Sequence, residues 1–253
     1  MKIVIIGGTG LVGSKLVALL REHGQQAVPA SLDTGVNTIT GEGLSNALTG
    51  AAVVVDVSNS PSFDDDPALE FFETSTKNQI AAESAAGVRH HVALSIVGCD
   101  RMTGSGYLRA KVAQEKLVRS SPIPYSIVRA TQFFEFAKRT ADAATTGNTV
   151  RIPHVLYQPM AAADVAAALC RVAEGAPLNG IVEIGGPQQF RFDDFIRQAL
   201  EAYHDHRDVV ADPDARYFGA VLDDHSLVPG AGARLGETRF QDWLQSSALP
   251  AHA

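Results

Sequence analysis

Tyr107 and Lys111 form the pair of side chains in this sequence that is best suited to proton transfer. They are four residues apart, about one helical turn, so in a helix both project from the same face. A nearby ammonium group stabilises a phenolate and lowers the tyrosine pKa, which is about 10 without such a neighbour. A tyrosine tuned in this way can give a proton to a carbonyl oxygen as hydride reaches the carbon. We predict that Tyr107 is the proton donor in a hydride transfer and that Lys111 tunes it.

Ser95 is the third residue that we assign to this chemistry. It lies at the end of a predicted strand, 90–95, ahead of the helix that carries Tyr107. In a doubly wound sheet the carboxyl ends of the strands face the ligand, so a hydroxyl there can polarise a substrate carbonyl. The alternatives are an ordinary strand-end serine and, for Tyr107, an amphipathic surface position, because the Tyr-x-x-x-Lys spacing also arises by chance.

A glycine-rich segment near the N-terminus, KIVIIGGTGLVGSKLVALL, predicts a dinucleotide-binding turn between an apolar strand and a helix. The first glycine of G-x-x-G-x-x-G permits the tight turn, the second lets the main chain approach a pyrophosphate, and the third lets the helix pack closely. Main-chain N–H groups at the helix N-terminus then face the phosphates. The predicted cofactor-binding residues of this turn are Gly7, Gly8, Thr9, Gly10, Leu11, Val12 and Gly13.

The choice between NADP and NAD depends on the end of the second strand, where an acidic side chain typically holds the ribose of NAD. Ser31 takes that position here, and its hydroxyl can donate to a 2′-phosphate without repelling it. Asp33 follows two residues later and favours NAD, but we expect it to lie past the strand in a loop. NADP(H) is therefore the predicted cofactor, and NAD(H) is the alternative.

The elements that must position these residues alternate along the first two thirds of the chain. Short β-branched runs are followed by longer helical stretches, which predicts an α/β fold with a doubly wound parallel sheet, the Rossmann fold. Several of these runs show little polar alternation, as in strands covered on both faces. The predicted strands are 2–6, 26–30, 52–57, 90–95, 125–128 and 181–184, and the predicted helices are 12–22, 67–86, 106–120, 131–144, 163–174, 193–203 and 238–245.

The texture of the sequence changes near residue 146, where segments become shorter and Gly and Pro more frequent. We predict an NAD(P)-binding Rossmann domain over 1–145 and a smaller C-terminal α+β substrate lobe over 146–253, interleaved with the first domain rather than independent. Two long irregular stretches, 153–160 and 211–236, are expected either to line a binding site or to be solvated surface excursions.

In combination these motifs resemble an atypical short-chain dehydrogenase/reductase of the NmrA-like family. The resemblance rests on GGTGLVG, VVVDVSNSP, HHVALSIVG, YLRAKVAQEKLV, YSIVRATQFFEF and the later ADVAAAL helix. It implies an NADP-binding Rossmann domain with a small C-terminal substrate lobe, and Lys111 would also bind the nicotinamide ribose. The further residues it implies are Val57, Ser58 and Asn59 beside the adenosine and ribose, Thr131 beside the nicotinamide, and Gln132, Phe133 and Phe134 at the substrate; packing in a helix core is the alternative for the aromatic residues.

The functional prediction is an NADP(H)-dependent oxidoreductase that transfers hydride to or from a small carbonyl or alcohol substrate. Many NmrA-like proteins lack the tyrosine and act as NADP-sensing regulators, so its presence here favours an enzyme. Two alternatives stay open: a non-catalytic NADP sensor that binds a partner protein, and a reductase of a C=C or C=N bond, which needs hydride but depends less on tyrosine. Only eleven residues separate Ser95 from Tyr107, fewer than in many members of the wider superfamily.

Composition excludes several other classes of function. The formal net charge of −7 leaves no broad positive field, so we expect no direct nucleic-acid partner. No window reaches the roughly 18 apolar residues of a membrane helix, and the N-terminus lacks the pattern of a secretion signal. The two cysteines, Cys99 and Cys170, suit reduced thiols of a cytoplasmic protein. The expected partner is a small-molecule substrate, and the sequence leaves a homodimer open.

Two histidine-containing runs invite a metal interpretation. They are His90–His91 and His204–Asp205–His206. Neither spacing puts a third ligand nearby, and alternation along a strand would separate the side chains of the first pair. We therefore predict solvated histidines and no metal site.

Overall fold

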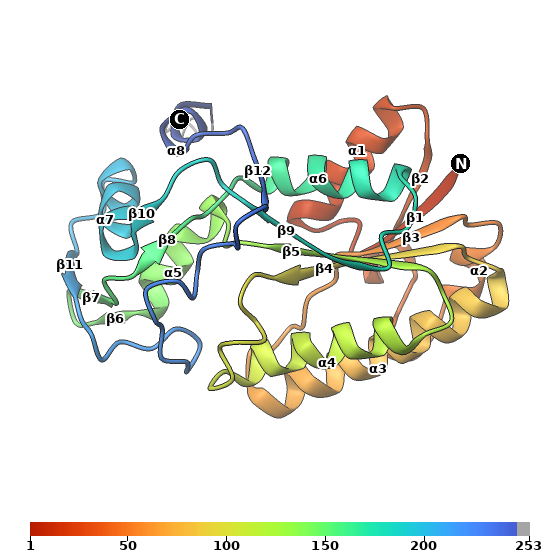
Figure 1. Ribbon diagram of the computed structural model, residues 1–253, viewed down its shortest axis with the longest axis horizontal. Helices are drawn as coiled ribbons and strands as arrows, with labels where there is room; N and C mark the ends of the chain where they lie inside the picture. The colour runs from red at the N-terminus through yellow and green to blue at the C-terminus, as the bar shows by residue number, and fades with distance from the viewer. Residues whose placement is uncertain (247–253) are drawn as a thin grey trace.

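A seven-stranded parallel sheet forms the centre of the molecule in the computed structural model, which describes residues 1–246 (Figure 1). Its order is β12-β9-β5-β4-β3-β1-β2. Helices cover both faces, so the inner strands are buried on both sides and consist of nearly continuous apolar runs. The strands are β1 (Lys2–Ile6), β2 (Gln26–Ala30), β3 (Val53–Asp56), β4 (His90–Ile96), β5 (Tyr125–Ala130), β9 (Gly180–Gly185) and β12 (Arg234–Leu235). The predicted doubly wound Rossmann fold is confirmed.

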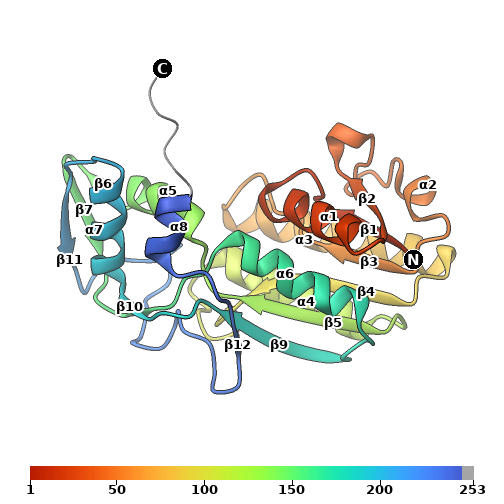
Figure 2. The same cartoon turned by 90° about the horizontal axis from the view of Figure 1, so that it is seen from above.

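Two pairs of helices form the outer layers. In Figure 1, α1 and α6 lie above the sheet and α3 and α4 below it, and Figure 2 shows α1 and α6 side by side from above. The longest helix, α3, has acidic residues in its first turn, which stabilise the positive end of its dipole, and it ends at Gly87 in the left-handed conformation. The helices that flank the sheet are α1 (Leu11–Glu22), α2 (Leu44–Leu48), α3 (Asp65–Ala86), α4 (Gly106–Ser120) and α6 (Ala162–Glu174). A 3-10 turn, η1 (Leu32–Thr34), follows β2.

The strand order places a topological switch point at the carboxyl edge of the sheet, and we call the region outside this edge the crevice. Strands β1 and β3 are neighbours in the sheet. After β1 the chain crosses to β2 on one side, whereas after β3 it crosses to β4 on the other side. Ligands of doubly wound sheets bind at such a switch point, outside the carboxyl ends of the strands. The loops after β1, β3, β4 and β5 all open onto this edge.

A second lobe packs beside the carboxyl edge of the sheet, on the left in Figure 1. Its core is aromatic, with Phe134, Tyr157, Phe192, Phe195 and Phe240 almost fully buried. Residues after 146 build both this lobe and, through α6, β9 and β12, part of the central layers; residues 247–253 lie outside the described part. The elements of the lobe are η2 (Phe134–Phe136), α5 (Ala137–Ala143), β6 (Thr145–Thr146), β7 (Thr149–Ile152), β8 (Leu156–Tyr157), β10 (Phe190–Arg191), α7 (Phe192–Ala202), β11 (Asp208–Ala211) and α8 (Phe240–Ser246).

The helix expected over 131–144 is wrong in its first half. The main chain of this segment pairs with Met160 instead, because Phe134 N donates to Met160 O at 3.0 Å and Met160 N donates to Gln132 O at 2.8 Å. This strand-like pairing holds the chain extended up to Phe133; the 3-10 turn η2 follows, and α5 begins only at Ala137. Among residues 1–246 no helix is both long and apolar enough to cross a bilayer.

Candidate functional site

The glycine-rich loop after β1 leaves room for a ligand close to its main chain. Gly7 has a φ of 78°, in the left-handed region that favours glycine, and a Cβ there would lie 3.0 Å from the main chain of Ser58. A Cβ on Gly13 would lie 2.2 Å from Gly7 O. Both glycines are therefore required for the loop to fold back tightly against the start of α1 and against the loop after β3.

The start of α1 presents free donors at this loop. Within residues 1–246, the main-chain N–H groups of Leu11, Val12 and Gly13 have no hydrogen-bond acceptor. Such groups carry the positive end of the helix dipole and are the usual partners of a phosphate. The residues predicted to bind a pyrophosphate thus form a cradle of the right chemistry.

Ser31 and Asp33 both lie beside this loop. The hydroxyl of Ser31 accepts a hydrogen bond from Thr9 N at 3.3 Å, and the hydroxyl of Thr9 donates to Asp33 Oδ2 at 3.4 Å. Asp33 lies in η1, past the end of β2, as the sequence predicts. Both side chains can reach the place where a ribose and its substituent would lie.

The loop after β3 forms the other wall of the crevice. Asp56 ends the strand, is 1% exposed, and accepts hydrogen bonds from the main chain and the hydroxyl of Ser58 at 2.9 and 2.6 Å. These bonds fix the turn through Val57 and Ser58, next to Gly7. The side chain of Asn59 follows on the same loop and points towards α4, where it meets Tyr107.

Tyr107 lies near the start of α4 with its hydroxyl in this crevice. It donates a 2.8 Å hydrogen bond to Asn59 Oδ1. Its ring lies 4.9 Å from Phe63 and 5.9 Å from Phe218, and the residue is only 8% exposed. Burial raises the pKa of the Tyr107 phenol, against the opposing charge of Arg139. The phenol is therefore protonated throughout the neutral range.

Lys111 lies one turn further along the same buried face of α4, as its spacing predicts. Its ammonium donates to Leu94 O at 2.9 Å and to Gln114 Oε1, and it lies 4.4 Å from the centre of the Phe72 ring. The expected lowering of the Tyr107 pKa by this ammonium is not found, because no hydrogen bond joins the two side chains in the described structure and burial dominates the phenol. Burial also lowers the pKa of Lys111.

Ser95 is buried at the end of β4, and its hydroxyl is occupied. It donates to Glu115 Oε1 at 2.6 Å. Glu115 in turn accepts two hydrogen bonds of 2.8 Å from Arg129, which also pairs with Asp100 at 2.8 Å. The structure therefore brings Ser95 into an ionic network between the sheet and α4 rather than into contact with Tyr107.

The segment after β5 carries polar side chains with unmet hydrogen-bonding capacity. Thr131 Oγ1 and both amide atoms of Gln132 are buried and have no hydrogen-bond partner among residues 1–246. Buried polar atoms without a partner are rare in native structures and often mark the place of a ligand. Phe133 is partly buried beside them, whereas Phe134 is 0% exposed and stacks in the lobe core on Phe195, so packing accounts for it.

Arg139 is a residue of this region that sequence reasoning missed. Its guanidinium lies 4.7 Å from the centre of the Phe63 ring, which itself contacts Tyr107. No carboxylate of the described chain pairs with it. An exposed cation thus stands beside the crevice. The packing of α5 against the loop after β3 brings it there, and no local sequence pattern predicts that contact.

The predicted solvation of His90 and His91 is wrong. They are 2% and 1% exposed, because β4 is covered on both faces. His90 Nε2 lies 2.8 Å from Ser126 Oγ, whereas His91 Nδ1 lies 2.9 Å from both carboxylate oxygens of Glu83. Both histidines therefore have structural partners, on opposite faces of the sheet.

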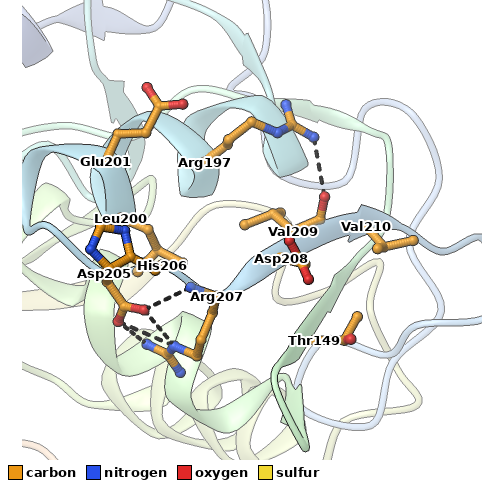
Figure 3. A pocket seen from close by; sticks show the side chains of 10 residues that line it. All are labelled: Thr149, Arg197, Leu200, Glu201, Asp205, His206, Arg207, Asp208, Val209 and Val210. Carbon is orange, nitrogen blue, oxygen red and sulfur yellow. Dashed lines mark hydrogen bonds and ion pairs between the residues drawn. The ribbon is translucent and has the colours of Figure 1, made fainter.

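His204 and His206 are both exposed, and His206 lines a surface depression of about 660 Å³ between α7 and β11 (Figure 3). Asp205 between them is held by Arg207, whose hydrogen bonds lower the pKa of that carboxyl to about 2. Figure 3 shows this pair, and Arg207 also bonds Asp142. Since the residues that line the depression come from α7, β7 and the segment leading into β11, and none of them belongs to the crevice, we assign it no part in the site.

Comparison with known proteins identifies the family of this chain. A family model described as NAD(P)H-binding matches residues 7–175, from the glycine-rich loop to the end of α6. The chain belongs to this NAD(P)H-binding family. A short-chain dehydrogenase/reductase superfamily protein from Agrobacterium tumefaciens with bound NAD has the same fold, with a TM-score of 0.72 over 98% of this chain and 96% of that chain at 17% identity. The predicted recognition is confirmed at this level, and the NmrA-like branch stays a prediction.

Two curated relatives of this NAD(P)H-binding chain differ in what their names describe. One, from Streptomyces griseus subsp. griseus, is (4-alkanoyl-5-oxo-2,5-dihydrofuran-3-yl)methyl phosphate reductase, 29% identical over 59% of this chain and 54% of its own. The other is the photosystem II assembly factor Ycf39 of Cyanophora paradoxa, 26% identical over 53% of this chain and 46% of its own. The chain spans about half the length of the curated relatives it matches.

Proposed function

We propose that this chain is an NADP(H)-dependent oxidoreductase that reduces a small carbonyl compound, with Tyr107 as the proton donor. The observation that carries the proposal is the 2.8 Å hydrogen bond from the Tyr107 hydroxyl to Asn59, which holds a phenol at the switch point of an NAD(P)H-binding fold. When bound, the nicotinamide supplies the hydride. The glycine-rich loop and the start of α1 would hold its pyrophosphate, and Thr131 would meet the nicotinamide.

The protonation state of Tyr107 favours reduction over oxidation. Burial raises the pKa of the phenol, so it carries its proton at neutral pH. An alkoxide forming on the substrate is a stronger base still and can take that proton. Alcohol oxidation would need the phenolate as a base, and burial disfavours that form. We infer that turnover runs mainly from carbonyl to alcohol.

Lys111 and Ser95 have supporting roles in this proposal. Lys111 would leave Leu94 O and Gln114 to bind the nicotinamide ribose, and from there its charge would oppose the effect of burial on Tyr107. Ser95 would polarise the substrate carbonyl only if its hydroxyl exchanged Glu115 for the substrate. Gln132 and Phe133 would contact the substrate, since both amide atoms of Gln132 are buried without a hydrogen-bond partner among residues 1–246.

The substrate that this crevice suits best carries an anionic group. Arg139 stands over Phe63, which contacts Tyr107, and its donors have no partner among residues 1–246. A guanidinium can bind a carboxylate or phosphate through two hydrogen bonds. The name of the Streptomyces relative, which describes a phosphate ester, supports this class.

The two cysteines are free and buried, which fits the reduced thiols of a cytoplasmic enzyme.

Turnover of NADPH against matched carbonyl compounds tests the proposal. We expect Tyr107→Phe to lower kcat by a factor of about 10² to 10⁴ while NADPH binding stays unchanged, because only the proton donor is lost. Tyr125→Phe is the matched control, because Tyr125 begins β5 and so lies at the end of that strand away from the crevice. Full turnover in Tyr107→Phe would overturn the mechanism. A panel that includes conjugated alkenes and imines identifies a C=C or C=N reductase, for which Tyr107→Phe would be nearly silent.

A second candidate function is an NADP-sensing protein without turnover. The observation that favours it is the cover over Tyr107, where Phe63 and Phe218 leave the residue 8% exposed. One relative is named as an assembly factor rather than as an enzyme, which supports a binding role. This candidate predicts NADPH binding in calorimetry with no loss of NADPH absorbance for any compound of the panel.

A further inference from the structure

Three potential metal ligands meet at the ends of α1 and α6. His23 caps the C-terminus of α1, and Cys170 and Glu174 lie one turn apart at the end of α6. One ligand atom from each residue lies within 4.8 Å of the others. Because α1 starts at the glycine-rich loop and runs for about 18 Å, this cluster lies at the opposite edge of the sheet from the crevice.

The distances within this His23–Cys170–Glu174 cluster match a coordination sphere. Cys170 Sγ lies 3.6 Å from His23 Nδ1 and 3.6 Å from Glu174 Oε2, and His23 Nδ1 lies 2.9 Å from that oxygen. Tetrahedral Zn²⁺ with bonds of about 2.3 Å to sulfur and about 2.0 to 2.1 Å to nitrogen and oxygen spaces its ligands by about 3.3 to 3.6 Å. Only the nitrogen and the oxygen must separate slightly to admit the ion.

We propose that His23, Cys170 and Glu174 form a Zn²⁺ site with water as the fourth ligand. Cys170 is 0% exposed and closes the inner side, whereas the His23 and Glu174 side chains are 44% and 24% exposed and leave an approach from solvent. Gln25 Nε2 donates to Glu174 Oε1 at 2.8 Å, which turns Oε2 towards the other two ligands. Such an outer hydrogen bond is the usual way of orienting a metal-binding carboxylate.

The three ligands also suit zinc chemically. Thiolate, imidazole and carboxylate are its common protein ligands, and the two negative charges balance the ion. A thiol binds zinc as the thiolate, so binding at Cys170 would release its proton to solvent. The bound ion would join α1 to α6 and raise the melting temperature.

Cobalt binding to the full-length chain, first freed of metal with a chelator, tests the site. We expect one equivalent of Co²⁺ to give the intense visible bands of tetrahedral cobalt and a sulfur-to-cobalt charge-transfer band in the near ultraviolet, and Zn²⁺ to abolish both. Cys170→Ser should lose the charge-transfer band, and His23→Gln and Glu174→Gln should each weaken binding at least tenfold. Cys99→Ser, at the other free thiol, and His206→Gln, at an exposed histidine, are the matched controls and should bind as the parent does.

Several outcomes would overturn the site. Absence of a sulfur-to-cobalt band in the unmodified chain means that the cluster is only a hydrogen-bonded contact between two helices, and this result needs no variant to fold. Persistence of the band in Cys170→Ser would place the ion elsewhere. Circular dichroism of each variant verifies its fold. None of these measurements depends on NADPH or on turnover, so the zinc site and the proposed reductase activity fail or stand separately.

Discussion

The carbonyl oxygen of Gly7 occupies the space that a β-carbon on Gly13 would need, since the two would be 2.2 Å apart. We expect Gly13→Ala to abolish NADPH binding, because the loop must open for the methyl group to fit. Alanine is otherwise the better helix former by about 1 kcal/mol, so a loss cannot come from helix propensity. Isothermal titration calorimetry with NADPH measures the effect. The control is Gly180→Ala, where the added carbon would make only an ordinary 3.6 Å contact; equal binding by both variants would contradict the prediction.

We expect Ser31 and Asp33 to decide between the two nicotinamide nucleotides. We expect the chain to bind NADPH at least tenfold more tightly than NADH, and Ser31→Ala to weaken NADPH alone by about 1 kcal/mol, the worth of one hydrogen bond. Asp33→Asn should tighten NADPH, because it removes a negative charge near the 2′-phosphate. Dissociation constants for both nucleotides provide the measurement. If Asp33→Asn instead weakened NADH tenfold, Asp33 would hold the ribose and NAD would be the cofactor.

His90 should make the protein sensitive to acid. Burial, helped by the neighbouring charge of His91, lowers the pKa of His90 from 6.5 to about 4, so the folded state holds it neutral while the unfolded state takes up a proton. The contribution of His90 to the free energy of unfolding is fully present above about pH 6.5. It decreases as the pH falls, and about 3 kcal/mol is lost at pH 4. His90→Gln should lose less stability between pH 7 and pH 4 in urea unfolding. His206→Gln is the control, and parallel pH profiles for the parent and His90→Gln would refute the assignment.

The buried pair of Glu115 and Arg129 should matter far more than an exposed pair. Although burial acts in the opposite direction, hydrogen bonds from Arg129 and Ser95 lower the pKa of Glu115, so Glu115→Gln removes a charge on which both partners depend. We expect a loss of roughly 3 kcal/mol in the free energy of unfolding. Glu73→Gln breaks the exposed 2.8 Å pair with Lys77 and should cost less than about 0.5 kcal/mol. Equal costs in urea titrations would show that the buried network is dispensable.

The central fold could be predicted from the sequence because its signals are local. Strands β1 and β2 and helix α4 have the predicted bounds, since Val and Ile runs, glycine turns and helical spacing each act within a few residues of the chain. The glycine-rich loop was predicted from such a local pattern, and the structure brings it beside Ser31 and the loop after β3, whose residues only the family resemblance implied. The four short strands β6, β8, β10 and β12 have two residues each and were missed, because pairing partners rather than composition define them.

The chemistry of the site depends on contacts that no local pattern carries. Asn59 meets Tyr107 across 48 positions in the sequence, and Arg139 reaches Phe63 only through the packing of the second lobe. The spacing of Tyr107 and Lys111 predicts a common helix face, which is correct, but it does not reveal that Leu94 O and Gln114 take the ammonium. Likewise, the sequence around Ser95 does not predict that its hydroxyl donates a hydrogen bond to Glu115.

The chain returns to the central sheet with β9 and β12 after it has already entered the second lobe, and α8, the last element of the described residues, lies in that lobe again. A second lobe arranged in this way cannot be exchanged between relatives at a single junction. Grafting a new specificity onto this nucleotide-binding scaffold, in the laboratory or by recombination between genes, would require several coordinated breakpoints. Loop-by-loop change around the crevice is therefore the easier route by which such proteins acquire different substrates.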